Sequence, residues 1–123
     1  WDYSYLSIRQ AGDKFILQQA VCKDAERQNP EQVKELASIP VEYLKMPGVA
    51  DNEWKTVYLR VKVRRGAVCT FAYSLDGKKY TTVGEAFTAR QGKWIGAKVG
   101  VFCVTPNEGN RGWADIDWFR MTK

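Results

Sequence analysis

Histidine is absent from the 123 residues of this chain, and its absence removes much of the side-chain chemistry that enzymes use. Ser–His and Cys–His pairs, which activate nucleophiles, cannot form without an imidazole base. The usual zinc sites that include histidine ligands are excluded for the same reason. The remaining catalytic option is a pair of carboxylates that act as acid and base.

Asp115 and Asp117 form a candidate pair of this kind in the stretch WADIDWFRM. On a β-strand, residues two apart lie on one face with their backbones roughly 6.5 to 7 Å apart. That separation falls in the range of the two carboxyl groups of an inverting glycosidase. Such a pair must flank the scissile bond from opposite sides, whereas neighbours on one strand point the same way. We therefore expect polar residues on an outer or groove face, and no catalytic residues.

Cofactor chemistry has no clear support in the sequence. Asp51, Asp115 or Asp117 could contribute to a calcium site, but no stretch has the ligand spacing of a calcium-binding loop. We therefore expect no cofactor, and calcium stays an unsupported alternative.

The three cysteines, Cys22, Cys69 and Cys103, lie in apolar, strand-like stretches without CxxC spacing. Buried free thiols are the expected state, because free cysteine behaves as a small hydrophobic residue. One disulfide with one thiol left over remains the alternative. The cysteines therefore do not fix the redox compartment.

Tryptophans are the candidates for sugar binding, which needs flat aromatic faces for stacking and polar groups for the hydroxyls. Trp54, Trp94 and Trp113 each lie where an expected loop meets an expected strand. With Asp115 and Asp117 they form the predicted carbohydrate-binding set. Tryptophans at such junctions also cover hydrophobic cores, so this alternative stays open.

The formal net charge of +5 does not come from one basic stripe. Nucleic-acid binding needs clustered basic residues with aromatic residues among them, so we expect no nucleic-acid partner. No run of about 18 apolar residues suggests a membrane span, and no membrane partner is expected. The basic residues, read as solvated outer faces, are Arg60, Lys62, Arg64, Arg65, Lys78, Lys79, Lys93 and Lys98.

The stretch Val57 to Gly84 gives the clearest signal for the elements that position these residues. Apolar and polar residues alternate over 57–63, as in a half-buried strand. Residues 67–74 are rich in β-branched and aromatic side chains, and Asp76-Gly77 fits a tight hairpin turn before a strand over 79–83. A three-stranded sheet with one apolar face needs a second layer to cover it.

The rest of the chain predicts further strands and completes a single all-β domain of residues 1–123. Short strands, frequent turns and a crossover indicate a two-sheet antiparallel sandwich of seven or eight strands. Further strands are expected at 3–10, 15–23, 35–41, 95–104 and 113–121, a short helical turn within 24–34 and a loop over 42–53. The expected buried residues include Phe71, Ile95, Val99, Val101, Ile116 and Trp118.

Several blocks of this sequence resemble the carboxyl-terminal domain of family 43 glycoside hydrolases, the β-xylosidase and α-arabinofuranosidase group. The blocks YLRVKV, CTFAYSLDGKKYTTVGEAFTARQGKWIGAKVGVFC and GWADIDWFR follow the family's order, so the resemblance covers Val57 to Arg120 strongly. DYSYLSIRQ and QQAVCKDA carry it more weakly. These first blocks resemble the middle of the family's domain, which implies that preceding strands are missing.

The resemblance implies a concanavalin A-like jelly roll attached to a five-bladed β-propeller that carries the catalytic carboxylates. Asp115 and Asp117 match the family's AD-DWF motif, which is not its catalytic pair. The expected function is a non-catalytic accessory domain, a fragment of a larger hydrolase of xylan- or arabinan-derived sugars.

The expected partners are the propeller of the same polypeptide and plant cell-wall oligosaccharides or polysaccharides. The resemblance favours a periplasmic or secreted location. An independent carbohydrate-binding module and a purely structural domain without a ligand are the alternatives.

Overall fold

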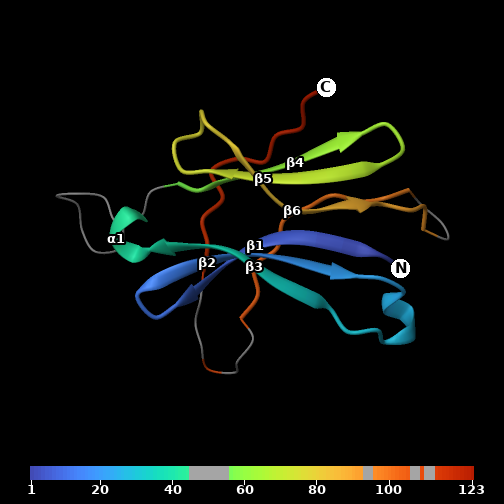
Figure 1. Cartoon of the computed structure of the whole chain (residues 1–123), viewed down its shortest axis with the longest axis horizontal. Coiled ribbons are helices and arrows are strands. Elements are labelled where there is room, and N and C mark those ends of the chain that lie inside the picture. The colour runs from blue at the N-terminus through green and yellow to red at the C-terminus, as the bar shows by residue number, and fades with distance from the viewer. Residues whose placement is uncertain (45–55, 93–95, 106–108, 110–112) are drawn as a thin grey trace.

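The computed structural model describes residues 1–44, 56–92, 96–105, 109 and 113–123. They form two three-stranded antiparallel sheets, in the orders β1-β2-β3 and β4-β5-β6 (Figure 1). The predicted all-β architecture is therefore confirmed. The elements are β1 Tyr3–Ala11, β2 Lys14–Cys22, a 3-10 turn Ala25–Arg27, β3 Gln32–Pro40, α1 Val41–Leu44, β4 Tyr58–Arg64, β5 Val68–Ser74 and β6 Thr81–Thr88.

The hairpin between β5 and β6 forms where the Asp-Gly pair predicted it. Gly77 has a positive φ of 71°, and the Asp76 carboxylate accepts hydrogen bonds from the backbone N–H groups of Lys78 and Lys79, each at 2.8 Å. Ser74 Oγ donates a further bond to this carboxylate at 2.9 Å. These bonds favour the ionised form and lower the pKa of Asp76 to about 2.

Strand β6 continues beyond the predicted end at residue 83. Gly84 lies inside the strand with a φ of 70°, a value that glycine adopts at little cost. The register between β5 and β6 shifts between Cys69 and Phe71, opposite this glycine. The residue that suggested a strand end is therefore a bulge, which lets the strand bend and continue.

The hydrophobic core is centred on β2, which lies between β1 and β3. Leu17 and Ala20 are fully buried, and Phe71 of β5 is buried as predicted. Burial on both faces of β2 explains why this strand is apolar along most of its length. The buried apolar residues are Ile16, Leu17, Ala20, Cys22, Ile39, Leu44, Phe71 and Phe87.

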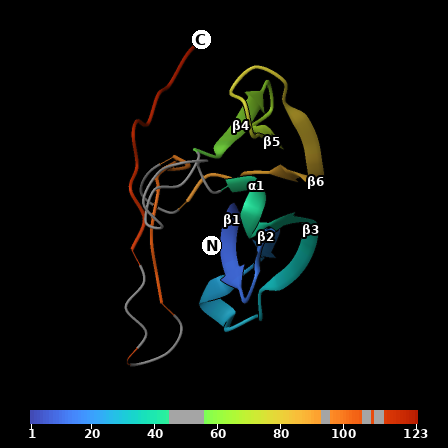
Figure 2. The same cartoon turned by 90° about the vertical axis from the view of Figure 1, so that its left-hand side faces the viewer.

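One contact between the two sheets is made by the amide side chain of Gln19. Gln19 of β2 is only 3% exposed, and it donates from Nε2 to the Glu85 carbonyl at 2.9 Å. Its Oε1 accepts from the Glu85 backbone N–H at 2.8 Å, so the amide pairs with β6 as a neighbouring strand would. Lys34 of β3 also lies 3.3 Å from the Glu85 carboxylate. These contacts hold β6 beside β3, as Figure 2 shows.

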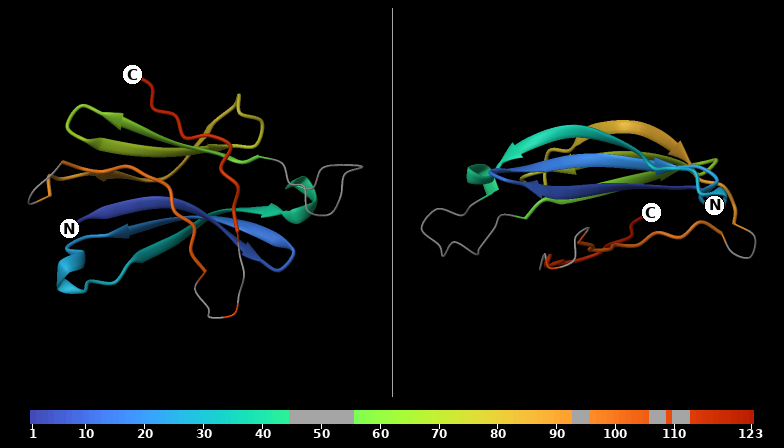
Figure 3. Two further views of the ribbon diagram at one scale, coloured as in Figure 1. Left: turned by 180° about the vertical axis from the view of Figure 1, so that it is seen from behind. Right: turned by 90° about the horizontal axis from the view of Figure 1, so that it is seen from below.

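The last described segments, 96–105 and 113–123, differ from the prediction because they are not paired as strands. They run along one side of both sheets (Figures 2 and 3). Alternation of apolar residues indicates which side chains would share a face, but it does not supply the partner strand that a ladder requires. Gly96 and Gly100 also weaken any strand there.

The predicted core is correspondingly wrong at four positions of these segments. Val99, Val101, Ile116 and Trp118 each expose half or more of their surface. They lack the opposing layer that burial requires. Ile95, the remaining member of the predicted set, lies outside the described residues.

Two further features qualify the sequence-based expectations. The expected loop over 42–53 begins with the helix α1, and residues 45–53 lie outside the described part.

All three cysteines are free, but only Cys22 is buried, whereas Cys103 is exposed. No helix of the described residues is long and apolar enough to cross a membrane.

Candidate functional site

The residues of the predicted carbohydrate-binding set do not gather into one described site. Trp113, Asp115 and Asp117 are exposed on a single extended segment, and Trp113 exposes 68% of its surface. Trp54 and Trp94 lie outside the described residues. The structure therefore presents one tryptophan of the set in a position that a sugar could reach.

Asp117 is tied to the start of β4, whereas Asp115 is not. Thr56 Oγ1 donates to the Asp117 carboxylate at 3.1 Å. The next residue, Trp118, lies against Tyr58 with a ring separation of 6.1 Å. No hydrogen bond or ion pair to Asp115 is found in the described ranges. This asymmetry fits a structural role for Asp117 and gives no geometry for acid and base catalysis by the pair.

Metal binding gains no geometric support within the described ranges. No three acidic or cysteine side chains there lie close enough together to hold a metal ion. A calcium contribution from Asp51, Asp115 or Asp117 stays a prediction, and Asp51 is outside the described residues.

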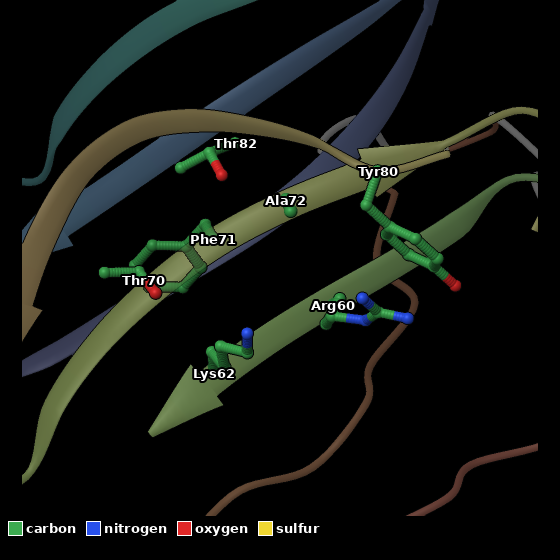
Figure 4. Close-up of a pocket in the computed structure, with 7 residues that line it drawn as sticks. All are labelled: Arg60, Lys62, Thr70, Phe71, Ala72, Tyr80 and Thr82. Carbon is green, nitrogen blue, oxygen red and sulfur yellow. The ribbon is translucent and has the colours of Figure 1, made fainter. Parts of the chain in front are cut away.

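A hollow of about 170 Å³ lies on one face of the β4-β5-β6 sheet (Figure 4). Arg60 of β4 is paired with Ala72 of β5, which is paired in turn with Thr82 of β6. Paired residues of adjacent strands project to the same face. The Ala72 side chain ends at Cβ between two longer neighbours, so the sheet is hollowed there. The lining residues are Arg60, Lys62, Thr70, Phe71, Ala72, Tyr80 and Thr82.

The hollow is cationic. The Arg60 guanidinium carbon lies 3.4 Å from the centre of the Tyr80 ring, a cation–π contact that Figure 4 shows. Lys62 adds a second positive charge, and no acidic residue is among the lining residues. The sequence reading placed both basic residues on a solvated outer face and missed the hollow. The available signals for the hollow were the alternation of residues in β4 and the small Ala72 in β5. The sequence does not show that Arg60 is paired with Ala72, which is needed to combine them.

A second cluster missed by the sequence reading lies at the start of β1. Tyr3 and Tyr5 share one face of the strand, and their rings stack with centres 6.3 Å apart and planes 9° apart. Both hydroxyls donate to the Glu31 carboxylate, at 2.7 and 2.9 Å. The hydrogen bond to Glu31 raises the pKa of Tyr3, and desolvation by burial raises that of Tyr5. The Tyr5 and Phe102 rings are nearly perpendicular, with their centres 5.0 Å apart.

Comparison with known proteins places the chain in a family. Residues 1–122 match the family described as the beta xylosidase C-terminal concanavalin A-like domain. A β-xylosidase of Formosa agariphila is 36% identical over 63 residues, which are 51% of this chain and 10% of that relative's length. No solved structure matches this chain. The family match spans nearly every residue, and the chain therefore belongs to the C-terminal concanavalin A-like domain family of β-xylosidases.

Proposed function

We propose that this chain is a non-catalytic accessory domain of a family 43-type glycoside hydrolase that acts on xylan- or arabinan-derived sugars. The observation that carries the proposal is the family match over residues 1–122. In this role the domain packs on a catalytic propeller of the same polypeptide and contributes to the shape of its substrate pocket. Secretion or export to the periplasm is part of the same proposal, because plant polysaccharides are extracellular.

Exposed apolar side chains support the packing role. Leu59, Val61 and Val63 of β4 expose 43%, 48% and 59% of their surface. Further exposed apolar residues follow along the segments 96–105 and 113–123. Large exposed apolar patches typically mark interaction surfaces. The matched relative is also far longer than this chain, so a hydrolase of that length has further polypeptide for such a surface to contact.

The docking experiment uses this domain and the catalytic module encoded with it, purified separately and mixed. We expect light scattering to show a one-to-one complex. Val61→Asp should weaken it by about tenfold or more, because a charge would enter a desolvated contact. Leu75→Asp is the matched control, since Leu75 is an exposed leucine in the β5–β6 hairpin.

The docking proposal fails if the two parts stay separate at all concentrations tested. It also fails in its choice of surface if Leu75→Asp weakens the complex as much as Val61→Asp. Thermal unfolding of each variant shows whether a loss of binding follows from a loss of folding.

Carbohydrate binding by the domain itself is a second candidate function. The exposed Trp113 and the stacked pair Tyr3 and Tyr5 favour it, because sugars bind flat aromatic faces. Titration with xylo-oligosaccharides should then quench tryptophan fluorescence with saturation, and Trp113→Ala should reduce the change. If the domain docks on the catalytic module but xylo-oligosaccharides cause no saturable change in fluorescence, a purely structural role without a sugar ligand is favoured.

A further inference from the structure

None of the residues that line the cationic hollow belongs to the apolar surface or to the aromatic sugar contact proposed above. Its floor is Ala72, its walls are formed by Arg60 and Thr82, and Thr70 and Lys62 pair beside them. At about 170 Å³ it is smaller than the pockets that enclose whole ligands. It suits one group of a longer molecule.

The charge of the hollow selects for an anion. Arg60 and Lys62 line it, and neither forms an ion pair with an acidic side chain in the part of the chain that the structure describes. The acid nearest in sequence to Tyr80 is Asp76, whose carboxylate is engaged by Ser74 and by backbone N–H groups of its own turn. An incoming anion would therefore meet two cations without a competing carboxylate.

The placement of Arg60 favours a planar anion. Its guanidinium lies over the Tyr80 ring, and stacking limits its rotation while leaving the N–H groups at its rim free to donate. A carboxylate accepts two such parallel hydrogen bonds. The hydroxyls of Thr70 and Thr82 add donors and acceptors of the kind that pair with sugar hydroxyls.

We propose that this hollow binds a carboxylate-bearing sugar unit, a uronate, within a plant polysaccharide or oligosaccharide. The choice of a sugar rests on the proposed function, whereas the choice of a carboxylate rests on the residues of the hollow. Arg60 holds the carboxylate, Lys62 adds a second positive charge, and the small Ala72 leaves space for the ring.

The test is calorimetric or NMR titration of the chain with three probes. These are xylotriose carrying one glucuronic acid, xylotriose alone and sodium sulfate. We expect the acidic oligosaccharide to bind about tenfold or more tightly than either of the others, because hydrogen bonds to charged groups are the strong ones. Its amide shift changes should centre on Ala72 and Thr82.

Substitutions separate the hollow from general electrostatic attraction. Arg60→Gln removes the charge and should weaken binding of the acidic probe by about tenfold. Arg64→Gln is the matched control, since Arg64 lies on the same strand and face but does not line the hollow. It should change the affinity less than about twofold, apart from a small effect of net charge. Ala72→Leu keeps every charge and should abolish binding by filling the space.

Three results would overturn the proposal. Equal binding of neutral and acidic xylotriose would remove the role of the carboxylate, and equal binding of sulfate would leave an anion site without sugar specificity. Equal losses in Arg60→Gln and Arg64→Gln would indicate diffuse attraction. Docking to the catalytic module is measured without these probes, so either proposal can fail while the other stands.

Discussion

At the scale of single residues, Gln19 is a buried polar side chain that joins the two sheets through two hydrogen bonds. Its amide satisfies both the N–H and the carbonyl of Glu85, so no other group is needed to pair them. A leucine of similar size would bury the same area but leave both backbone groups without a partner. The two hydrogen bonds therefore matter more than the hydrophobic contribution of this position.

We expect Gln19→Leu to lower the free energy of unfolding by about 1 to 3 kcal/mol, the cost of leaving buried polar groups unpaired. Gln10→Leu is the matched control because Gln10 is an exposed glutamine near the end of β1, and it should change stability by less than about 0.5 kcal/mol. Urea unfolding of both variants measures the difference. Equal effects would show that the amide does not hold the sheets together.

Asp76 makes stability depend on pH in a defined window. Its folded pKa of about 2 lies below that of the unfolded chain, about 4. A lowered pKa means that the native state binds the proton less well, so this contribution is complete above about pH 4 and is lost as the pH falls through 2.

Asp76→Ala should therefore reduce the loss of stability between about pH 4 and 2 relative to the wild-type chain. Urea unfolding at several pH values gives both curves, and NMR titration of the carboxyl group gives the pKa directly. An Asp76 midpoint near 4 would contradict the hydrogen bonding in the turn.

At the scale of elements, the bulge at Gly84 determines how β6 meets the other sheet. Gly84 has a φ of 70°, and a Cβ built there would clash with the Gln19 amide oxygen. Gly12, in the β1–β2 turn, has a similar φ of 63° but open space around it. Substitution of Gly12 therefore measures backbone strain alone, whereas substitution of Gly84 measures backbone strain together with a steric clash.

Gly12→Ala should cost about 1 to 2 kcal/mol, the usual strain of a left-handed backbone with a side chain. Gly84→Ala should cost about 2 to 4 kcal/mol, because the Gln19 amide must also move away from Glu85. Thermal or urea unfolding of the pair gives the comparison. Equal losses would mean that the amide adjusts freely.

The hairpins were predictable because their signals are local. Alternation in 57–63 indicated β4, and the Asp76-Gly77 pair indicated the hairpin between β5 and β6, before any contact was known. Gly84 misled the sequence reading because a bulge and a strand end share the same residue type. The cationic hollow could not be predicted in this way, because it requires Arg60, Ala72 and Thr82 to be paired across three strands. That pairing depends on the register of the strands, which is not a local signal.

At the scale of the whole molecule, we predict that this chain alone does not hydrolyse aryl-xylosides or aryl-arabinosides, because its sequence has no histidine and the described residues give no geometry for acid and base catalysis by Asp115 and Asp117. The measurement is release of the aryl group at high protein concentration. Turnover that disappears in Asp115→Asn or Asp117→Asn would place catalysis in this domain and contradict the proposed accessory role.

The whole molecule also predicts two levels of backbone protection. Strand β2 is hydrogen-bonded to β1 on one side and to β3 on the other, and its residues Leu17 and Ala20 are buried. The backbone amides of β2 should therefore exchange only when the core unfolds. Residues 96–105 and 113–123 lack a strand ladder and expose most of their apolar side chains. Their amides should exchange with solvent early, on a time scale at which β2 is unchanged.

Hydrogen exchange of the isolated chain, read by mass spectrometry of peptides, measures both levels. In the complex with the catalytic module, the late segments should become protected while β2 changes little, since the packing surface then replaces solvent. If 96–105 exchanges as slowly as β2 in the isolated chain, that segment is a paired strand, as its alternation predicted. Its apolar side chains would then belong to the core, and only the exposed residues of β4 would remain as a surface for the partner.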